Sequence, residues 1–264
     1  MSDAPSLLME KDGPIGWIIF NRPEKRNAVG VETWELMPKY VQDLATDDAI
    51  RVVIMRGAGD KAFVAGADIS QFKDRRRNMA DEEEYRRIGA RGRDAINALT
   101  KPILAMIHGY CVGGGVAIAI SCDIRIAADD ARFGIPAARL GLGYHWSGME
   151  QLMALVGPSV TKEIFFTART DWNAQDALRM GLVNQVVPKA ELETFTRDYA
   201  IMIAKNAPLT MRSAKASVKE LLRPTAERDL QHLEKLIADC FNSEDYQEGV
   251  RAFAEKRRPQ FQGR

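Results

Sequence analysis

Two segments of the sequence place glycines between a strand-like run and a helix-like run. Residues 63–68 read Phe-Val-Ala-Gly-Ala-Asp, and residues 110–116 read Tyr-Cys-Val-Gly-Gly-Gly-Val. Backbone N–H groups at a helix start have no partner within the helix and carry partial positive charge. Two such turns that converge would form an oxyanion hole, whereas either turn alone is more simply a tight connection without chemistry.

A third segment, residues 140–150, gathers side chains that could exchange protons or donate hydrogen bonds. His145 titrates near neutrality when its surroundings do not perturb it, and Tyr144 can donate a hydrogen bond to a carboxylate or carbonyl. Packing is the alternative role for both. Glu150 is expected in the helix that follows, and His108 and His232 are interpreted as structural.

Taken in chain order, these segments and several others resemble the crotonase superfamily, the enoyl-CoA hydratase and isomerase family. The resemblance covers nearly the whole chain. It rests on residues 21–28 (Asn-Arg-Pro-Glu-Lys-Arg-Asn-Ala), 65–69, 113–115, 122–127, 133–134, 140–141, 181–187, 243–249 and 253–257.

The resemblance implies an α/β crotonase fold of repeated ββα units in a spiral core, with a helical C-terminal subdomain for trimerisation. It implies homotrimers, or hexamers built as dimers of trimers. It also implies an acyl-CoA thioester substrate, with coenzyme A as part of that substrate and no permanently bound cofactor or metal. The N–H groups of Ala67 and Gly114 would hold the thioester oxygen and stabilise an enolate.

The same resemblance implies a binding surface for the coenzyme A part of the substrate. Lys256, contributed by this subunit or a neighbouring one, would meet a phosphate, although Lys25 and Lys256 are equally read as solvated surface charge. The residues assigned to the coenzyme A site are Lys25, Arg26, Ala28, Ala65, Asp68, Ile69 and Lys256.

The sequence departs from the family where hydratases carry two catalytic glutamates. Ala117 follows the glycine triplet at the first of these positions, and Ala137 follows Pro136 at the second. Each general acid or base contributes about 10² to 10⁴ in rate, and an alanine methyl can replace neither. The sequence therefore argues against an ordinary enoyl-CoA hydratase.

Residues 140–148 are similar to the methylmalonyl-CoA decarboxylase branch, which has a tyrosine at the position of Tyr144. Loss of CO₂ from a malonyl-type thioester generates the enolate without a base. Tyr144 would orient the carboxylate, and His145 or water would return the proton. That branch has a histidine at the position of Ala67 and a glutamate at that of Ala117. The substrate of that branch therefore cannot be assigned to this protein.

Three alternatives stay open beside this decarboxylase-like lyase. One is a hydratase or isomerase that uses His145 or Glu150 as acid and base. Another is a non-catalytic acyl-CoA binder. The third is RNA binding through the basic run at residues 73–93, ranked last because the formal net charge is only +1.

The candidate site residues must be positioned by the surrounding strands and helices. The first half of the sequence is rich in strands and the second half is helical, which predicts an α/β core at residues 1–200 and a helical subdomain at 201–264. A hairpin is expected at 7–20, strands at 51–56, 102–107, 123–128 and 183–187, and helices at 31–45, 81–99, 174–180, 189–205, 208–222, 225–241 and 244–257. The basic run of the helix at 81–99, Arg86, Arg87, Arg91 and Arg93, is read as a solvated face.

The composition fits a globular protein. The 264 residues are 46% hydrophobic and 28% charged, and three cysteines are too few for a disulfide framework. Residues 102–122 lack charge, but glycines interrupt them, so a membrane span is not expected. The N-terminus shows no secretory signal, and we expect a cytoplasmic protein without a nucleic-acid partner.

Overall fold

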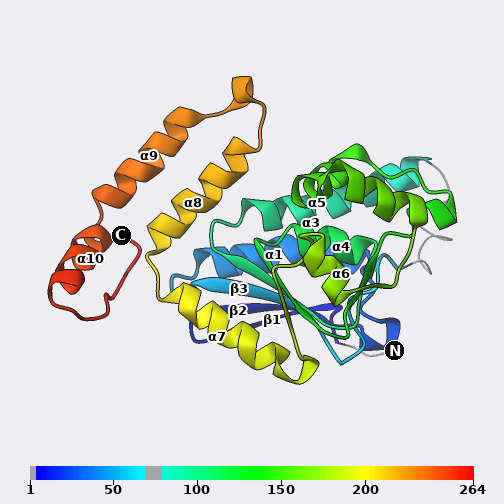
Figure 1. Cartoon of the computed structure of the whole chain (residues 1–264), viewed down its shortest axis with the longest axis horizontal. Helices are drawn as coiled ribbons and strands as arrows, with labels where there is room; N and C mark the ends of the chain where they lie inside the picture. Colours follow the sequence, from blue (N-terminus) through cyan, green and yellow to red (C-terminus); the bar gives the residue numbers. More distant parts are fainter. Residues whose placement is uncertain (1–3, 69–78) are drawn as a thin grey trace.

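The computed structural model describes residues 4–68 and 79–264. Its main sheet has six strands in the order β1-β2-β3-β5-β7-β10 (Figure 1). The first two strands form the expected antiparallel hairpin, and the others run parallel. The bounds are β1 Leu7–Asp12, β2 Ile15–Phe20, β3 Val52–Gly57, β5 Ile103–Ile107, β7 Ile124–Ala128 and β10 Gln185–Val187.

A smaller sheet of four strands, in the order β4-β6-β8-β9, lies beside the first. Its strands are β4 Ala62–Val64, β6 Tyr110–Val112, β8 Arg132–Gly134 and β9 Trp172–Asn173. Each successive pair, β3 with β4, β5 with β6 and β7 with β8, places one strand in each sheet before the next helix. This repeat confirms the predicted ββα architecture.

Helices cover both faces of the six-stranded sheet. One face packs on α7 through Leu192 and Ala200, and the other contributes to a larger core with α1, α3, α4 and α5. Their bounds are α1 Val31–Thr46, α3 Met79–Ala98, α4 Gly114–Ile120, α5 Trp146–Thr167, α6 Ala174–Arg179 and α7 Leu192–Ala204. Over the described ranges, no helix combines the length and apolar character that a bilayer crossing requires.

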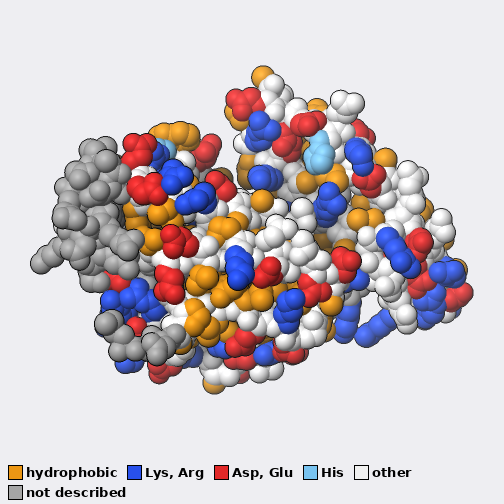
Figure 2. All heavy atoms as spheres, turned by 180° about the vertical axis from the view of Figure 1, so that it is seen from behind, with side chains coloured by type: hydrophobic (Ala, Val, Ile, Leu, Met, Phe, Trp, Pro, Cys, Tyr) orange, Lys and Arg blue, Asp and Glu red, His pale blue; other side chains and the backbone are white. Residues whose placement is uncertain are grey.

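The last three helices, α8 Pro208–Leu221, α9 Leu230–Phe241 and α10 Glu244–Ala254, extend away from the sheets (Figures 1 and 2). The prediction that α9 starts at residue 225 is wrong. Pro224 leads only into a short 3-10 turn, and α9 begins after Asp229, whose side chain accepts a hydrogen bond from the His232 N–H. The predicted division near residue 200 and the trimer stay predictions.

Candidate active site

The two glycine-rich turns meet at the junction of β4 and α4. Val29 forms a parallel bridge with Ala67, in which the Val29 N–H donates to Gly66 and the Asp68 N–H donates to Val29. The Ala67 N–H therefore points to the opposite side. A β-carbon added to Gly114, the first residue of α4, would lie 3.7 Å from the Ala67 nitrogen.

Both N–H groups are available to a ligand. Among the hydrogen bonds between described residues, neither the Ala67 nor the Gly114 N–H donates to a backbone carbonyl. The Gly114 N–H lies in the first turn of α4, where the helix leaves such groups unpaired. The structure thus brings together the two donors that the sequence assigned to an oxyanion hole.

The glycines allow this close approach. A β-carbon at Gly115 would lie 2.0 Å from the Val64 carbonyl oxygen, and Gly113 has a φ of 55°. A side chain at position 115 would push α4 away from β4 and so separate Gly114 from Ala67.

The two positions at which hydratases carry glutamates are apolar here. Ala117 is half-buried in the first turns of α4, and Ala137 is 6% exposed at the start of a 3-10 turn over residues 137–140. Neither methyl group can activate water or protonate a carbon.

Tyr144 is half-buried. Its ring packs edge-on against Phe165, with ring centroids 4.9 Å apart, and rests on Gly148. Burial raises the pKa of Tyr144, and the nearby positive charge of Arg93 opposes that shift. The hydroxyl therefore stays protonated near neutrality and can donate a hydrogen bond.

His145, in contrast, is exposed and caps the N-terminus of α5. Its Nδ1 accepts a hydrogen bond from the Ser147 N–H at 3.3 Å and lies 2.8 Å from Ser147 Oγ. Its Nε2 lies 3.5 Å from an Arg86 guanidinium nitrogen. Glu150 is exposed in α5, as expected.

Four of the proposed coenzyme A residues adjoin one another. The Ala65 N–H donates to the Arg26 carbonyl, and the Arg26 guanidinium lies 4.8 Å from the centroid of the Tyr110 ring. Buried Asp68 forms ion pairs with Lys25 at 3.3 Å and with Arg22 at 2.8 Å. Arg22 lies in the motif at residues 21–28, but the sequence assigned it no role of its own.

The other three assigned residues are Ala28, Ile69 and Lys256. Ala28 accepts a hydrogen bond from Arg22, in the same cluster. Ile69 lies outside the described residues. Lys256 follows α10, in the helices that extend away from the sheets, and is exposed (Figure 1).

The prediction that the basic run of α3 is a solvated face is wrong for Arg93. This residue is half-buried, and its guanidinium lies 5.7 Å from the centroid of the Trp34 ring on α1. Two glycines inside the helix, Gly89 and Gly92, were the signal in the sequence. A β-carbon at Gly92 would lie 2.6 Å from Trp34, so the helix needs these glycines to approach α1.

Part of the basic run proposed for RNA, residues 73–77, lies outside the described residues. Arg86 and Arg87 form ion pairs with Glu83 and Glu84, which offset their charge. Figure 2 likewise shows positive and negative side chains interspersed over the face that it presents.

Comparisons with known proteins agree with this geometry. The model of the enoyl-CoA hydratase/isomerase family matches residues 10–264. A short-chain-enoyl-CoA hydratase of Clostridium acetobutylicum is 35% identical, covering 96% of both chains, and a carnitinyl-CoA dehydratase of Proteus mirabilis is 36% identical, covering 98% of this chain and 99% of its own.

Solved structures show the same similarity. An enoyl-CoA hydratase/carnithine racemase from Magnetospirillum magneticum superposes with a TM-score of 0.92 at 32% identity, covering 99% of this chain and 97% of the other. An enoyl-CoA hydratase from Bacillus anthracis gives 0.91 at 29% identity, covering 98% and 100%. The chain therefore belongs to the enoyl-CoA hydratase/isomerase family, the crotonase superfamily of acyl-CoA-processing enzymes.

Proposed function

We propose that this protein is a decarboxylase-type lyase for an acyl-CoA thioester that carries a carboxylate on its α-carbon. The observation that carries the proposal is the replacement of both hydratase glutamates by alanines, one of them buried, beside an intact pair of N–H donors. The bond between the α-carbon and the carboxylate breaks, CO₂ leaves, and the electron pair forms the thioester enolate. A proton then adds to the α-carbon.

The residues have separate roles in this reaction. The Ala67 and Gly114 N–H groups stabilise the enolate oxygen, and losing one such donor costs about 10² to 10³ in rate. The Tyr144 hydroxyl orients the carboxylate, and His145 or water supplies the proton.

Coenzyme A belongs to the substrate in this proposal. Lys25, Arg26 and Ala65 line its path together with Asp68, which holds Lys25 in place. Because α10 extends away from the site of its own subunit, Lys256 contacts a phosphate of the coenzyme A that is bound at a neighbouring subunit of a homotrimer or hexamer.

Product analysis by mass spectrometry tests the reaction. The protein is incubated with malonyl-, methylmalonyl-, ethylmalonyl- and crotonyl-CoA, and Tyr144→Phe is run in parallel. We expect loss of CO₂ from a malonyl-type ester and a slower reaction in Tyr144→Phe. Addition of water to crotonyl-CoA, without CO₂ loss from the acidic esters, would overturn the proposal.

Hydration is the second candidate, because similar proteins are named as hydratases and dehydratases. His145 would then be the acid and base. His145→Asn separates catalysis from folding, since asparagine is a strong N-cap residue but does not titrate near neutrality. His145→Ala removes both roles.

With water as the proton source, we expect His145→Asn to keep CO₂ release and thermal stability, while His145→Ala loses about 0.5–2 kcal/mol of stability. Addition of water to crotonyl-CoA by the wild type, lost in both variants, would favour hydration through His145. Binding of acyl-CoA esters without turnover of any of them would leave the non-catalytic binder as the function.

A further inference from the structure

Two hydrogen-bond donors converge over Gly89 on α3. A β-carbon at Gly89 would lie 3.2 Å from an Arg93 guanidinium nitrogen and 3.8 Å from the Trp34 indole nitrogen. The guanidinium also lies over the Trp34 ring, a cation–π arrangement that holds it in place. The missing side chain at Gly89 thus allows the Arg93 guanidinium to lie against α3, close to the Trp34 indole nitrogen.

Within the described part of the chain, no hydrogen-bond acceptor pairs with these two donors. Arg93 forms no ion pair there, and the Trp34 N–H, which reaches solvent, donates no hydrogen bond to a described residue. The exposed Arg86 and Arg87 of the same helix are both paired with glutamates. A half-buried guanidinium without a carboxylate partner favours an anionic ligand.

The side of α3 that carries Arg93 faces the segment that carries Tyr144. Arg86 and Arg93 are seven residues apart, about two helical turns, and therefore lie on one side of α3. Arg86 contacts His145 at 3.5 Å, which places this side of α3 against residues 144–145. The positive charge of Arg93 is close enough to Tyr144 to act on its ionisation.

We propose that Arg93 and Trp34 bind the carboxylate of the acyl chain and select acidic acyl-CoA thioesters. This inference rests on the proposed function and names the residues that recognise its substrate class. A guanidinium offers a carboxylate two parallel N–H donors, and the Trp34 N–H and Tyr144 O–H add further donors. An uncharged acyl chain would leave the guanidinium unpaired.

This role is one of binding and orientation. The negative charge moves from the carboxylate to the thioester oxygen as CO₂ leaves, so Arg93 stabilises the bound substrate and the enolate is stabilised elsewhere. Removing Arg93 is therefore expected to raise KM without lowering kcat.

Binding measurements with a stable substrate mimic test the inference independently of turnover. The ligands are the amide analogue of malonyl-CoA, in which NH replaces the thioester sulfur, and butyryl-CoA, which has no second charge. Isothermal titration compares the wild type with Arg93→Gln, Arg93→Lys and Trp34→Phe. Arg91→Gln is the matched control, because Arg91 is exposed on the same helix.

We expect Arg93→Gln to weaken binding of the malonyl analogue about 10- to 100-fold and to leave butyryl-CoA unchanged. Arg93→Lys should recover part of the loss, Trp34→Phe should lose less, and Arg91→Gln should bind like the wild type. Equal weakening of both ligands, or none, would overturn the inference. Arg93-dependent binding without CO₂ release would instead overturn the proposed reaction alone, whereas CO₂ release with unaltered binding in Arg93→Gln would overturn only the role of Arg93.

Discussion

At the scale of single residues, Gly114 and Gly115 are neighbours with different requirements. A β-carbon at Gly115 would lie 2.0 Å from the Val64 carbonyl oxygen, and backbone at that point cannot move aside without displacing β4. At Gly114 the nearest atoms lie at 3.7 Å, which is ordinary van der Waals contact. Position 115 is thus a packing constraint, whereas position 114 can accept a β-carbon and still present its N–H group.

We predict that Gly115→Ala destabilises the protein, by about 1–3 kcal/mol or more for overpacking, and that Gly114→Ala does not. Chemical denaturation measures both free energies of unfolding. Gly115→Ala should also lose activity, because α4 must shift away from Ala67. Wild-type stability in Gly115→Ala would show that β4 and α4 adapt more easily than this contact indicates.

The sequence predicted the pairing of Ala67 with Gly114, because the resemblance fixed both turns in chain order. It failed for Arg93. A run of charged residues on a helix reads as solvated, and only the tertiary approach of α1 to α3 over Gly89 and Gly92 buries one of its members. Such burial depends on contacts between distant segments, which periodicity does not report.

At the scale of elements, the strands and long helices follow local patterns, and most were predicted within a few residues. The start of α9 was missed because a helical pattern does not reveal that Pro224 and Asp229 divide it. The capping contact of His145 was not predicted either. Its Nδ1 contact with Ser147 makes it the cap of α5, and its part in catalysis stays a prediction.

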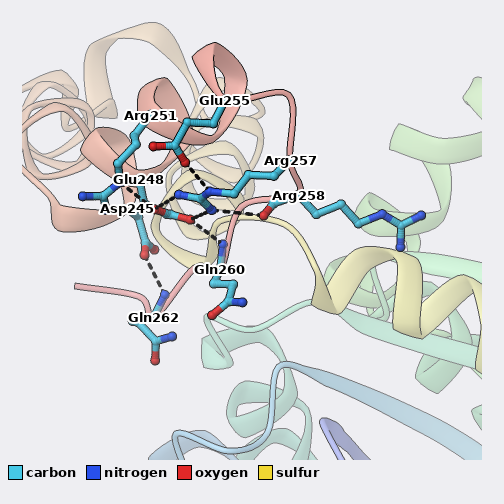
Figure 3. A network of polar contacts seen from close by, with 8 residues as sticks. All are labelled: Asp245, Glu248, Arg251, Glu255, Arg257, Arg258, Gln260 and Gln262. Carbon is cyan, nitrogen blue, oxygen red and sulfur yellow. Dashed lines mark hydrogen bonds and ion pairs between the residues drawn. The ribbon is translucent and has the colours of Figure 1, made fainter.

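The chain after α10 is held by carboxylates of that helix (Figure 3). Glu248 accepts hydrogen bonds from Arg251, Arg257 and the Gln260 N–H, and Asp245 accepts from the Gln262 N–H. The hydrogen bonds from Arg257 and Arg251 hold the pKa of Glu248 well below its usual range.

Because the pKa of Glu248 is lower in the folded state than in the unfolded chain, its carboxylate stabilises the folded state at pH values above the unfolded pKa, about 4.3 for glutamate. This stabilisation decreases below that pH and is lost as the pH falls through the folded-state pKa. We therefore predict that acid loosens the chain after α10. Hydrogen exchange at the Gln260 amide, after correction for the intrinsic rate, should lose protection below about pH 4.

Glu248→Gln should reduce this protection already at neutral pH and remove most of its acid dependence. Glu234→Gln, on the exposed side of α9, is the matched control and should behave like the wild type. Protection that is the same at pH 7 and pH 3 in the wild type would contradict the prediction.

At the scale of the whole molecule, α8, α9 and α10 expose several large apolar side chains, a feature typical of interaction surfaces. Phe253 is 88% exposed, Phe241 61% and Val250 56%. A cavity of about 690 Å³ between these helices is lined mainly by apolar side chains. The sheets bury their own apolar residues without these helices, so the exposed surface is available to another copy of the chain.

We therefore predict that the protein assembles through α8–α10, as a trimer or a dimer of trimers. Light scattering after size exclusion gives the mass, and Phe253→Ser should shift it toward the 29.4 kDa monomer while circular dichroism stays unchanged. Phe166→Ser, which alters an equally exposed ring on α5, is the control and should keep the assembled mass. Dissociation in Phe166→Ser alone would move the contact to α5. A monomeric wild type would remove the neighbouring subunit that Lys256 needs, and with it the proposed phosphate contact.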